Sequence, residues 1–351
     1  MNNVTMLHGA GGKYMLQFIH KYVLKYFGDL SRNIDVPLYL LEDSAIVNGI
    51  AFTTDSYTVY PLFFPGGDIG RMAVCGTIND LAVKGATKIL GVSCGLIIEE
   101  GFEISNIEKI LNSMREAALE AETSIITGDT KVVEKGRVDK LLINCSGIGV
   151  PGQELMQNYE IIKRSRDDHS SMWLITKNIR AGDKIILNGP LGDHAVAILA
   201  ARGELGFKSD VKSDVAPLNK LMREALKVGG VTCAKDPTRG GLAGLLNEWA
   251  ENTGLGFVIR EDALPISSAA KAASELLGID ILEVGNEGKV VMSVINDKAE
   301  EILESIKNSG WSQASIIGYV TDSFKGVILE TTIGGKRIIP PPIGDPVPRI
   351  C

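Results

Sequence analysis

Short apolar runs rich in β-branched residues alternate along this chain with longer stretches in which apolar positions recur at helical spacing. Runs of four to eight such residues are typical of strands, and the longer periodic stretches are typical of amphipathic helices. Their alternation predicts an α/β (α+β) fold. Strands are predicted at 38–41, 50–54, 89–98, 124–127, 140–150, 184–187, 256–260 and 290–295. Helices are predicted at 13–27, 69–84, 105–120, 193–202, 217–227, 241–251, 269–277 and 298–308, with Ser105 and Glu108 forming a capping-box pattern.

The pattern turns polar between residues 151 and 183, where the charged run 163–168 is typical of a solvated linker. A length of 351 residues also favours two domains. We therefore predict an N-terminal domain at 1–160, a C-terminal domain at 161–335 and a flexible tail at 336–351.

The tail, KRIIPPPIGDPVPRIC, contains five prolines and ends in Cys351. Proline removes backbone donors and fixes φ, which predicts an extended, semi-rigid arm. One interpretation is a frayed end with an incidental thiol. The other is a device that presents a covalently bound group, because thiolates are good nucleophiles and exposed cysteines are otherwise avoided.

Composition narrows the class of protein. The chain is 45% hydrophobic and carries a formal net charge of −7, so no basic surface is expected to hold nucleic acid or an anionic membrane. No apolar run is long enough to span a bilayer, and the N-terminal residues lack the apolar core of a signal peptide. The five cysteines form no CxxC pair, which favours a reducing cytoplasm.

The glycine-rich segment Gly9–Lys13 is neither a P-loop nor a dinucleotide fingerprint, because Tyr14 stands where each motif needs another residue. Two interpretations remain for it: a flexible N-terminal loop or a loop that covers phosphates.

Acidic residues are more informative. Asp43, Asp55 and Asp129 each follow an apolar run, and Asp80 lies inside an apolar helix. Carboxylates gathered at the ends of strands repel one another unless a cation lies between them, and Mg²⁺ bridging to substrate phosphates is the usual solution. Taken singly, each acid has a plainer interpretation as a cap of a turn or helix.

A second group of polar residues follows in the C-terminal half. Asp236 and Thr238 precede two glycines and a helix, a context in which backbone N–H groups bind anions. Glu287 lies on the turn NEGK, and Lys131 follows Asp129 by two residues. Lys131 and Glu287 are candidates for charge stabilisation and proton transfer, although each taken singly is typical of a surface residue.

With these residues in place, the chain resembles the HypE family of hydrogenase maturation proteins, the carbamoyl dehydratases of nickel–iron hydrogenase assembly. The matching stretches include MLHGAGGKYM, TTDSYTVYPLFFPGGDIGRMAVCGTINDLAVKGA, ITGDTKVVEKG, GPLGDHAVAILAARGELGF, DPTRGGLAGLLNE, NEGK and the terminal PRIC, which together span nearly the whole chain. The terminal PRIC is the most specific of them. The middle motifs are shared with aminoimidazole ribonucleotide synthetase, selenophosphate synthetase and thiamine-monophosphate kinase.

The resemblance implies a two-domain fold like that of aminoimidazole ribonucleotide synthetase, whose N-terminal sheets pair in a homodimer. It implies that ATP is bound by residues at Asp43, Asp55, Asn79, Asp80, Asp129, Thr130 and Asp236. It implies Mg²⁺ at the five aspartates of that set, and catalytic roles for Cys351, Lys131 and Glu287. The implied partners are the carbamoyltransferase HypF and the HypC–HypD iron scaffold.

The implied reaction is the ATP-dependent dehydration of an S-carbamoyl group on Cys351 to a thiocyanate. Two other classes of function are alternatives: an enzyme that acts on a free small molecule, and a scaffold protein. A selenophosphate synthetase normally carries a cysteine or selenocysteine in its glycine-rich loop, and HGAGGK has none; a thiamine-phosphate kinase has no use for a terminal PRIC. The non-enzymatic alternative is a scaffold whose tail docks on a partner protein.

Overall fold

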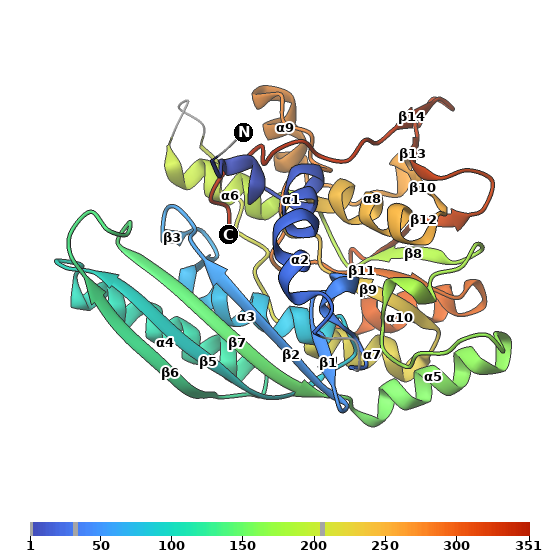
Figure 1. Cartoon of the computed structure of the whole chain (residues 1–351). Coiled ribbons are helices and arrows are strands. Elements are labelled where there is room, and N and C mark those ends of the chain that lie inside the picture. The colour runs from blue at the N-terminus through green and yellow to red at the C-terminus, as the bar shows by residue number, and fades with distance from the viewer. Residues whose placement is uncertain (1–2, 31–33, 204–207) are drawn as a thin grey trace.

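Two mixed sheets organise residues 3–30, 34–203 and 208–351, the parts of the chain that this computed structural model describes (Figure 1). The strands are β1 (Ala45–Val47), β2 (Ile50–Tyr57), β3 (Phe63–Phe64), β4 (Gly67–Asp68), β5 (Lys88–Glu99), β6 (Ile125–Val133), β7 (Leu141–Val150), β8 (Lys184–Leu187), β9 (Val231–Lys235), β10 (Gly256–Arg260), β11 (Val291–Val294), β12 (Ser315–Thr321), β13 (Gly326–Glu330) and β14 (Lys336–Ile338). The α-helices are α1 (Gly12–Phe18), α2 (Leu24–Phe27), α3 (Ile69–Ala82), α4 (Ile104–Glu120), α5 (Gln153–Ser165), α6 (Asp193–Arg202), α7 (Asn219–Val228), α8 (Gly241–Thr253), α9 (Ser268–Leu277) and α10 (Ala299–Asn308).

The first sheet has the strand order β1-β2-β7-β5-β6, in which only β5 and β6 pair in parallel. Helix α3 packs on β2, β7 and α4, and its apolar sequence is buried on nearly every side. Asp68 caps its first turn by accepting hydrogen bonds from the backbone N–H groups of Gly70 (2.7 Å) and Arg71 (3.0 Å). Gly76 allows this helix to approach β2, since a Cβ there would lie 2.3 Å from the Tyr57 hydroxyl.

The second sheet has the order β14-β13-β10-β12-β8-β11-β9. Strand β9 lies at one edge of this sheet, beside β11, every residue of which is buried. Because β9 continues directly into the segment with Asp236, this sheet carries that carboxylate toward α3 of the first half. The site described below lies where the two halves meet.

Several predicted elements needed correction. Residues 38–41 were predicted as a strand but form a 3-10 turn, Leu38–Leu40, that ends at Leu41 in the left-handed region (φ 52°). The predicted helix 13–27 is interrupted by a π-helical segment, Ile19–Val23. The N-cap of α4 is Glu103, not Ser105, so the predicted capping box is wrong. The sequence pattern did not predict the strands β1, β3, β4, β9, β12, β13 and β14.

The polar stretch 151–183 is not an extended linker, because α5 occupies much of it. Leu155 and Ile162 are buried, and Asn158 bonds to the start of β9 through Gly230 and Val231. Helical periodicity is present there, but the charged residues on its outer face mask it. The predicted domain boundary at 160/161 falls within this helix, and its position stays a prediction.

The proline-rich tail begins as a strand and then crosses the molecule. Strand β14 pairs antiparallel with β13 at the edge of the second sheet, where a proline-rich segment is tolerated. In Figure 1 the dark-red chain then returns to the C label near α6 and β3. Val347 and Ile350 are buried, so the end of the tail packs against the body of the protein.

Candidate active site

The tail brings Cys351 into a cavity of about 460 Å³ formed by the N-terminal segment, the end of β2 and the turn before α8. Burial raises the pKa of the Cys351 thiol; the negative charge of Glu287 raises it further, Arg239 opposes this, and Asp55 adds to the rise. The structure therefore brings together two of the three predicted catalytic residues, Cys351 and Glu287, which lie 64 positions apart in the sequence.

Glu287 is only 3% exposed. Burial and the charges of Asp236, Asp214 and Asp55 hold the pKa of its carboxyl well above the ordinary 4.5, while Arg239 acts in the opposite direction. Both polar groups of its backbone are hydrogen-bonded. The Glu287 N–H donates to Asp214 (3.2 Å), and its carbonyl accepts from the Asn79 side chain (3.2 Å). The carboxyl group thus stands on a rigid turn.

Asn79 has a structural task at this point. Its amide also donates to the carbonyl of Ala216 (3.1 Å) and accepts from the N–H of Leu218 (2.8 Å). These bonds join α3 to the second half of the chain. These side-chain bonds of Asn79 all go to protein backbone, and its contact with ATP stays a prediction.

Arg239 is a site residue that the sequence reasoning missed. It lines the same cavity, and its pKa is raised first by the Cys351 thiol and then, against burial, by Asp55, Glu287 and Asp80. The signal was present in the sequence, since an arginine next to two glycines at the start of a helix is typical of an anion-binding turn.

Four of the predicted acidic residues also meet. Burial and the charges of Asp236, Asp55 and Asp43 raise the pKa of Asp80 well above its ordinary value. Burial and Asp43 raise that of Asp236 to about 7. The predicted reason for their meeting was wrong, however. Asp55 lies within β2 and Asp43 in the turn before β1, so these acids do not mark the ends of strands. Thr53 donates to Asp80 at 2.7 Å.

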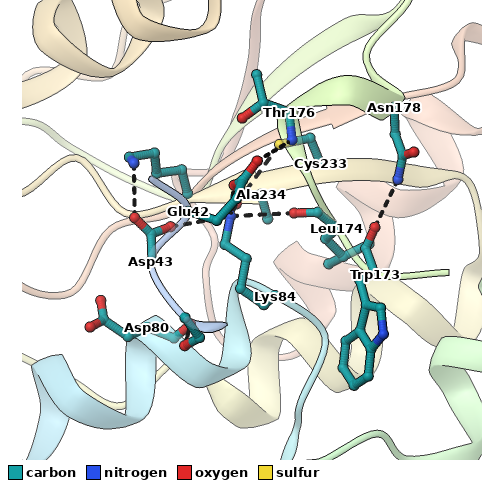
Figure 2. Close-up of polar contacts among 12 residues, drawn as sticks. Glu42, Asp43, Asp80, Lys84, Trp173, Leu174, Thr176, Asn178, Cys233 and Ala234 are labelled. Atoms are coloured by element: carbon teal, nitrogen blue, oxygen red, sulfur yellow. Dashed lines mark hydrogen bonds and ion pairs between the residues drawn. The ribbon is translucent and has the colours of Figure 1, made fainter. Parts of the chain in front are cut away.

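Figure 2 shows how Asp43 is held, through a buried lysine that the sequence reasoning also missed. Lys84 Nζ lies 2.7 Å from Glu42 and 3.2 Å from Asp43, and it donates to the carbonyls of Leu174 (3.3 Å) and Ala234 (2.9 Å). Burial alone would lower the pKa of Lys84, but Glu42 and Asp43 more than offset it.

Lys235 completes this network from β9, at 2.9 Å from both Asp43 and Glu248. Burial acts to raise the pKa of Asp43, but Lys235 and Lys84 together lower it. Asp43 is therefore ionised, with its charge largely compensated by protein. Its Oδ2 atom lies 3.2 Å from Lys84 Nζ but receives no hydrogen bond of good geometry.

The remaining predicted residues, Asp129, Thr130 and Lys131, lie away from this cluster. They are exposed on β6, the outer strand of the first sheet, three strands from β2 and so about 14 Å away at ordinary strand spacing. Lys131 pairs with the exposed Ile97 of β5 and shares its open face. One chain by itself does not bring these three residues to Cys351.

The glycines of Gly9–Lys13 serve backbone packing. Gly12 has φ 69°, and a Cβ there would lie 2.3 Å from the carbonyl oxygen of Pro342 in the tail. Gly11, at φ 78°, approaches the backbone of Arg239 in the same way. The loop therefore lies against both the tail and the turn that carries Arg239.

Known proteins share this architecture. The family model described as AIR synthase related protein, N-terminal domain, matches residues 41–151, and the corresponding C-terminal domain model matches 180–329. Carbamoyl dehydratase HypE of Escherichia coli is 38% identical over 100% of both chains, and that of Bradyrhizobium diazoefficiens is 41% identical over 99% of this chain and 96% of its own. The chain belongs to the HypE family.

Other relatives of this HypE family member agree. A putative hydrogenase expression/formation protein of Methanocaldococcus jannaschii is 46% identical over 99% of each chain. A solved HypE–HypF complex has a TM-score of 0.82 at 43% identity, covering 93% of this chain and 99% of that one. A HypE structure in complex with ATP has a TM-score of 0.78 at 35% identity, covering 99% and 100%. Thiamine monophosphate kinase of Aquifex aeolicus, at 15% identity, shares the fold (TM-score 0.64).

The expected two-domain fold of aminoimidazole ribonucleotide synthetase type is thereby confirmed, and so is the expected class: the protein is an enzyme of the carbamoyl dehydratase family that serves hydrogenase maturation. Among the helices that the structure describes, none has the length and apolar character needed to cross a membrane. Residues 204–207, the end of the family-like stretch GPLGDHAVAILAARGELGF, lie outside the described part of the chain.

Proposed function

We propose that this chain uses ATP to dehydrate an S-carbamoyl group on its own Cys351 to a thiocyanate, which supplies cyanide ligands for nickel–iron hydrogenase. The observation that carries this proposal is the position of Cys351, at the end of a tail packed into a cavity that Arg239 lines, where the charge of the buried Glu287 acts on its thiol. An enzyme acting on a free substrate has no need to place its own terminal thiol beside a buried carboxyl group and a cation.

The chemistry requires activation because oxide is a very poor leaving group. The thiocarbamate oxygen attacks the γ-phosphorus of ATP, ADP leaves, and loss of one N–H proton forms a C=N bond. Loss of the second N–H proton then completes C≡N as the C–O bond breaks and phosphate departs. Overall, the carbamoyl group and ATP give thiocyanate, ADP and phosphate.

Glu287 is placed to accept these protons, since its buried carboxyl group is near enough for its charge to raise the pKa of the Cys351 thiol. Arg239 is placed to stabilise negative charge on the oxygen and the transferred phosphate. Lys131, the other predicted cation, acts in this scheme only if a second copy of the chain brings it to the site.

The acidic cluster is suited to a divalent cation that is shared with ATP. Burial and the mutual repulsion of Asp43, Asp55, Asp80 and Asp236 raise the pKa of Asp80 and Asp236, and Asp43 Oδ2 receives no hydrogen bond of good geometry. Within the described ranges, no three acidic, histidine or cysteine side chains form a ready metal site. This fits Mg²⁺, which usually takes one or two carboxylates and completes its shell with phosphates and water. Bound there, it would offset the charge of the triphosphate.

A second copy of the chain is the partner we propose for the open face of the first sheet. Phe52, Leu90 and Ile97 are between 39% and 46% exposed on it, and Asp129 and Lys131 stand along its outer strand. Pairing of these faces would bury the apolar residues and bring Asp129, Thr130 and Lys131 near an ATP site. We further propose HypF as the carbamoyl donor protein, as in the solved HypE–HypF complex, HypC–HypD as the acceptor of cyanide, and the cytoplasm as the compartment.

The test supplies the full chain with HypF, carbamoyl phosphate and Mg–ATP and follows the mass of the C-terminal peptide. We expect the peptide to gain a carbamoyl group and then lose one water. Glu287→Gln should still be loaded but should lose water about 10²- to 10⁴-fold more slowly, whereas Glu251→Gln, on the surface of α8, should behave as wild type. Loading of the wild type without loss of water would overturn the proposal.

The pH dependence provides a second measure. Glu287 must be ionised to accept a proton, and its pKa is held well above 4.5. The dehydration rate should therefore rise with pH along an acidic limb displaced above 4.5, and this limb should be absent from the residual rate of Glu287→Gln.

A further inference from the structure

The last four residues of the tail are held through their backbone. The carbonyl of Pro348 accepts from Arg202 (2.5 Å), and that of Arg349 accepts from Arg202 (3.2 Å) and from the N–H of Tyr60 (3.1 Å). The last two carbonyls are bound as well: that of Ile350 contacts His194 Nε2 (2.8 Å), and that of Cys351 accepts from the Thr58 hydroxyl (3.1 Å). Bonds to successive carbonyls define how far the tail enters the cavity.

His194 is built into this position. It is fully buried and meets Phe64 edge-on at 5.5 Å. Because the Ile350 carbonyl can only accept, Nε2 must carry the proton, and Nδ1 then accepts from the Ser213 hydroxyl (2.8 Å). Burial lowers the pKa of His194, which keeps the ring neutral and this arrangement intact. A neutral histidine in this tautomer is a fixed donor aimed at the tail.

Both side chains that bind the tail's carbonyls, His194 and Arg202, belong to one helix of the C-terminal half. His194 lies in the first turn of α6 and Arg202 in the last. Residues of the N-terminal half close the other side: Arg349 of the tail donates to the carbonyl of Thr58 (3.1 Å) and lies 5.4 Å from the centre of the Tyr60 ring. The end of the tail is therefore clamped between the two halves of the molecule.

The docked Cys351 thiol is poorly placed to receive the carbamoyl group, the step called loading below. Burial raises the pKa of Cys351, so the thiolate that must attack a carbamoyl donor is scarce inside the cavity. In loading, sulfur bonds to the carbonyl carbon of an activated carbamoyl donor, the thiol proton is lost, and the donor's leaving group departs. That donor is held by another protein, so the tail has to leave the clamp.

We propose that His194 and Arg202 are positioning residues that hold the tail at the depth where Cys351 meets Glu287, and that the same contacts oppose loading. This inference rests on the proposed function. It implies that weakening the clamp changes the two half-reactions in opposite directions, because the docked tail is the reactive state for dehydration and the unreactive state for loading.

The first measurement needs no turnover. Wild type and variants are treated with iodoacetamide, and alkylation of the C-terminal peptide is followed by mass spectrometry. His194→Ala and Arg202→Ala should each raise the rate about fivefold or more, as expected from the loss of a hydrogen bond. His194→Gln should restore slow alkylation, since its amide can both donate to Ile350 and accept from Ser213. His20→Ala and Arg260→Ala, both at exposed positions, are the matched controls.

The second measurement separates the half-reactions. With HypF as donor protein, the alanine variants should accept the carbamoyl group faster than wild type, with a lower KM for the donor protein. They should then dehydrate it about tenfold more slowly in a single turnover. A fall in both rates together, or unchanged alkylation, would overturn the clamp. Failure of the wild type to lose water would instead count against the proposed function, and alkylation would still decide the clamp.

Discussion

Buried charges decide much of the local chemistry in this protein, and Lys84 is among the fully buried ones. Its ammonium group has no exposure and holds Glu42 and Asp43 from the first half together with carbonyls of the second half (Figure 2). Deleting one partner of such a network leaves the others buried without compensation, which costs far more than the loss of a surface pair.

Lys84→Met should accordingly lower the free energy of unfolding by about 3–5 kcal/mol, measured from the urea midpoint of the free protein. Lys220→Met removes a surface lysine that pairs with Glu122 and is about half exposed. That control should change stability by less than about 1 kcal/mol. Equal effects of the two substitutions would contradict the view that Lys84 joins the halves.

Helix α5 shows how an element can be tied into the fold by one polar side chain. Asn158 is 1% exposed; it donates to the carbonyl of Val231 (2.9 Å) and accepts from the N–H groups of Gly230 and Val231 (2.8 Å each). These bonds fix the first residue of β9, the strand that leads to Lys235 and Asp236. The helix thus supports the acidic cluster from the far end of that strand.

Asn158→Ala should destabilise the protein by roughly 3 kcal/mol, because it leaves three buried backbone groups without partners. Asn112→Ala is the matched control: Asn112 is exposed on α4 and its side chain donates to Glu116, so its loss should cost less than about 0.5 kcal/mol. Urea unfolding of both variants measures the difference, and a small effect of Asn158→Ala would show that α5 is an independent appendage.

At the scale of the molecule, the first sheet has one face covered by α3 and α4 and one open face with exposed apolar residues. The candidate residues Asp129, Thr130 and Lys131 stand on its outer strand, away from the cavity that holds Cys351. The single chain therefore contains both parts of the predicted site but does not join them, which is the reason for proposing a second copy.

Ile97→Lys places a charge on that open face. Burying an unpaired lysine in an apolar interface is costly, so we expect the dimer to dissociate at least about tenfold more readily in sedimentation experiments, with the circular dichroism spectrum unchanged. Ile333→Lys makes the same substitution at a position that is 93% exposed in a loop of the second half and should leave the dimer intact. A monomeric wild type that is fully active would contradict the proposed pairing.

Local sequence patterns were enough to predict many of the helices, strands and motifs. The helix at 193–202 and the strands at 184–187 and 256–260 were placed with the observed bounds, because their apolar periodicity is strong and turn residues flank them. The aspartates were recognisable because they follow or interrupt apolar runs, Glu287 because it lies on the turn NEGK, and Cys351 because it ends a proline-rich arm. The residues 38–41 were misjudged because an apolar run is ambiguous between strand and turn until its neighbours are known.

The amino-acid order was thus sufficient for the fold class, the family and the carboxylates Asp43, Asp55, Asp80, Asp236 and Glu287, since these depend on local spacing. Arg239, Lys84 and the clamp at His194 and Arg202 depended on contacts between segments distant in the chain. Which buried charges compensate one another, and how deep the tail enters, follows from the packing of the two halves, because desolvation and Coulomb interactions act through space.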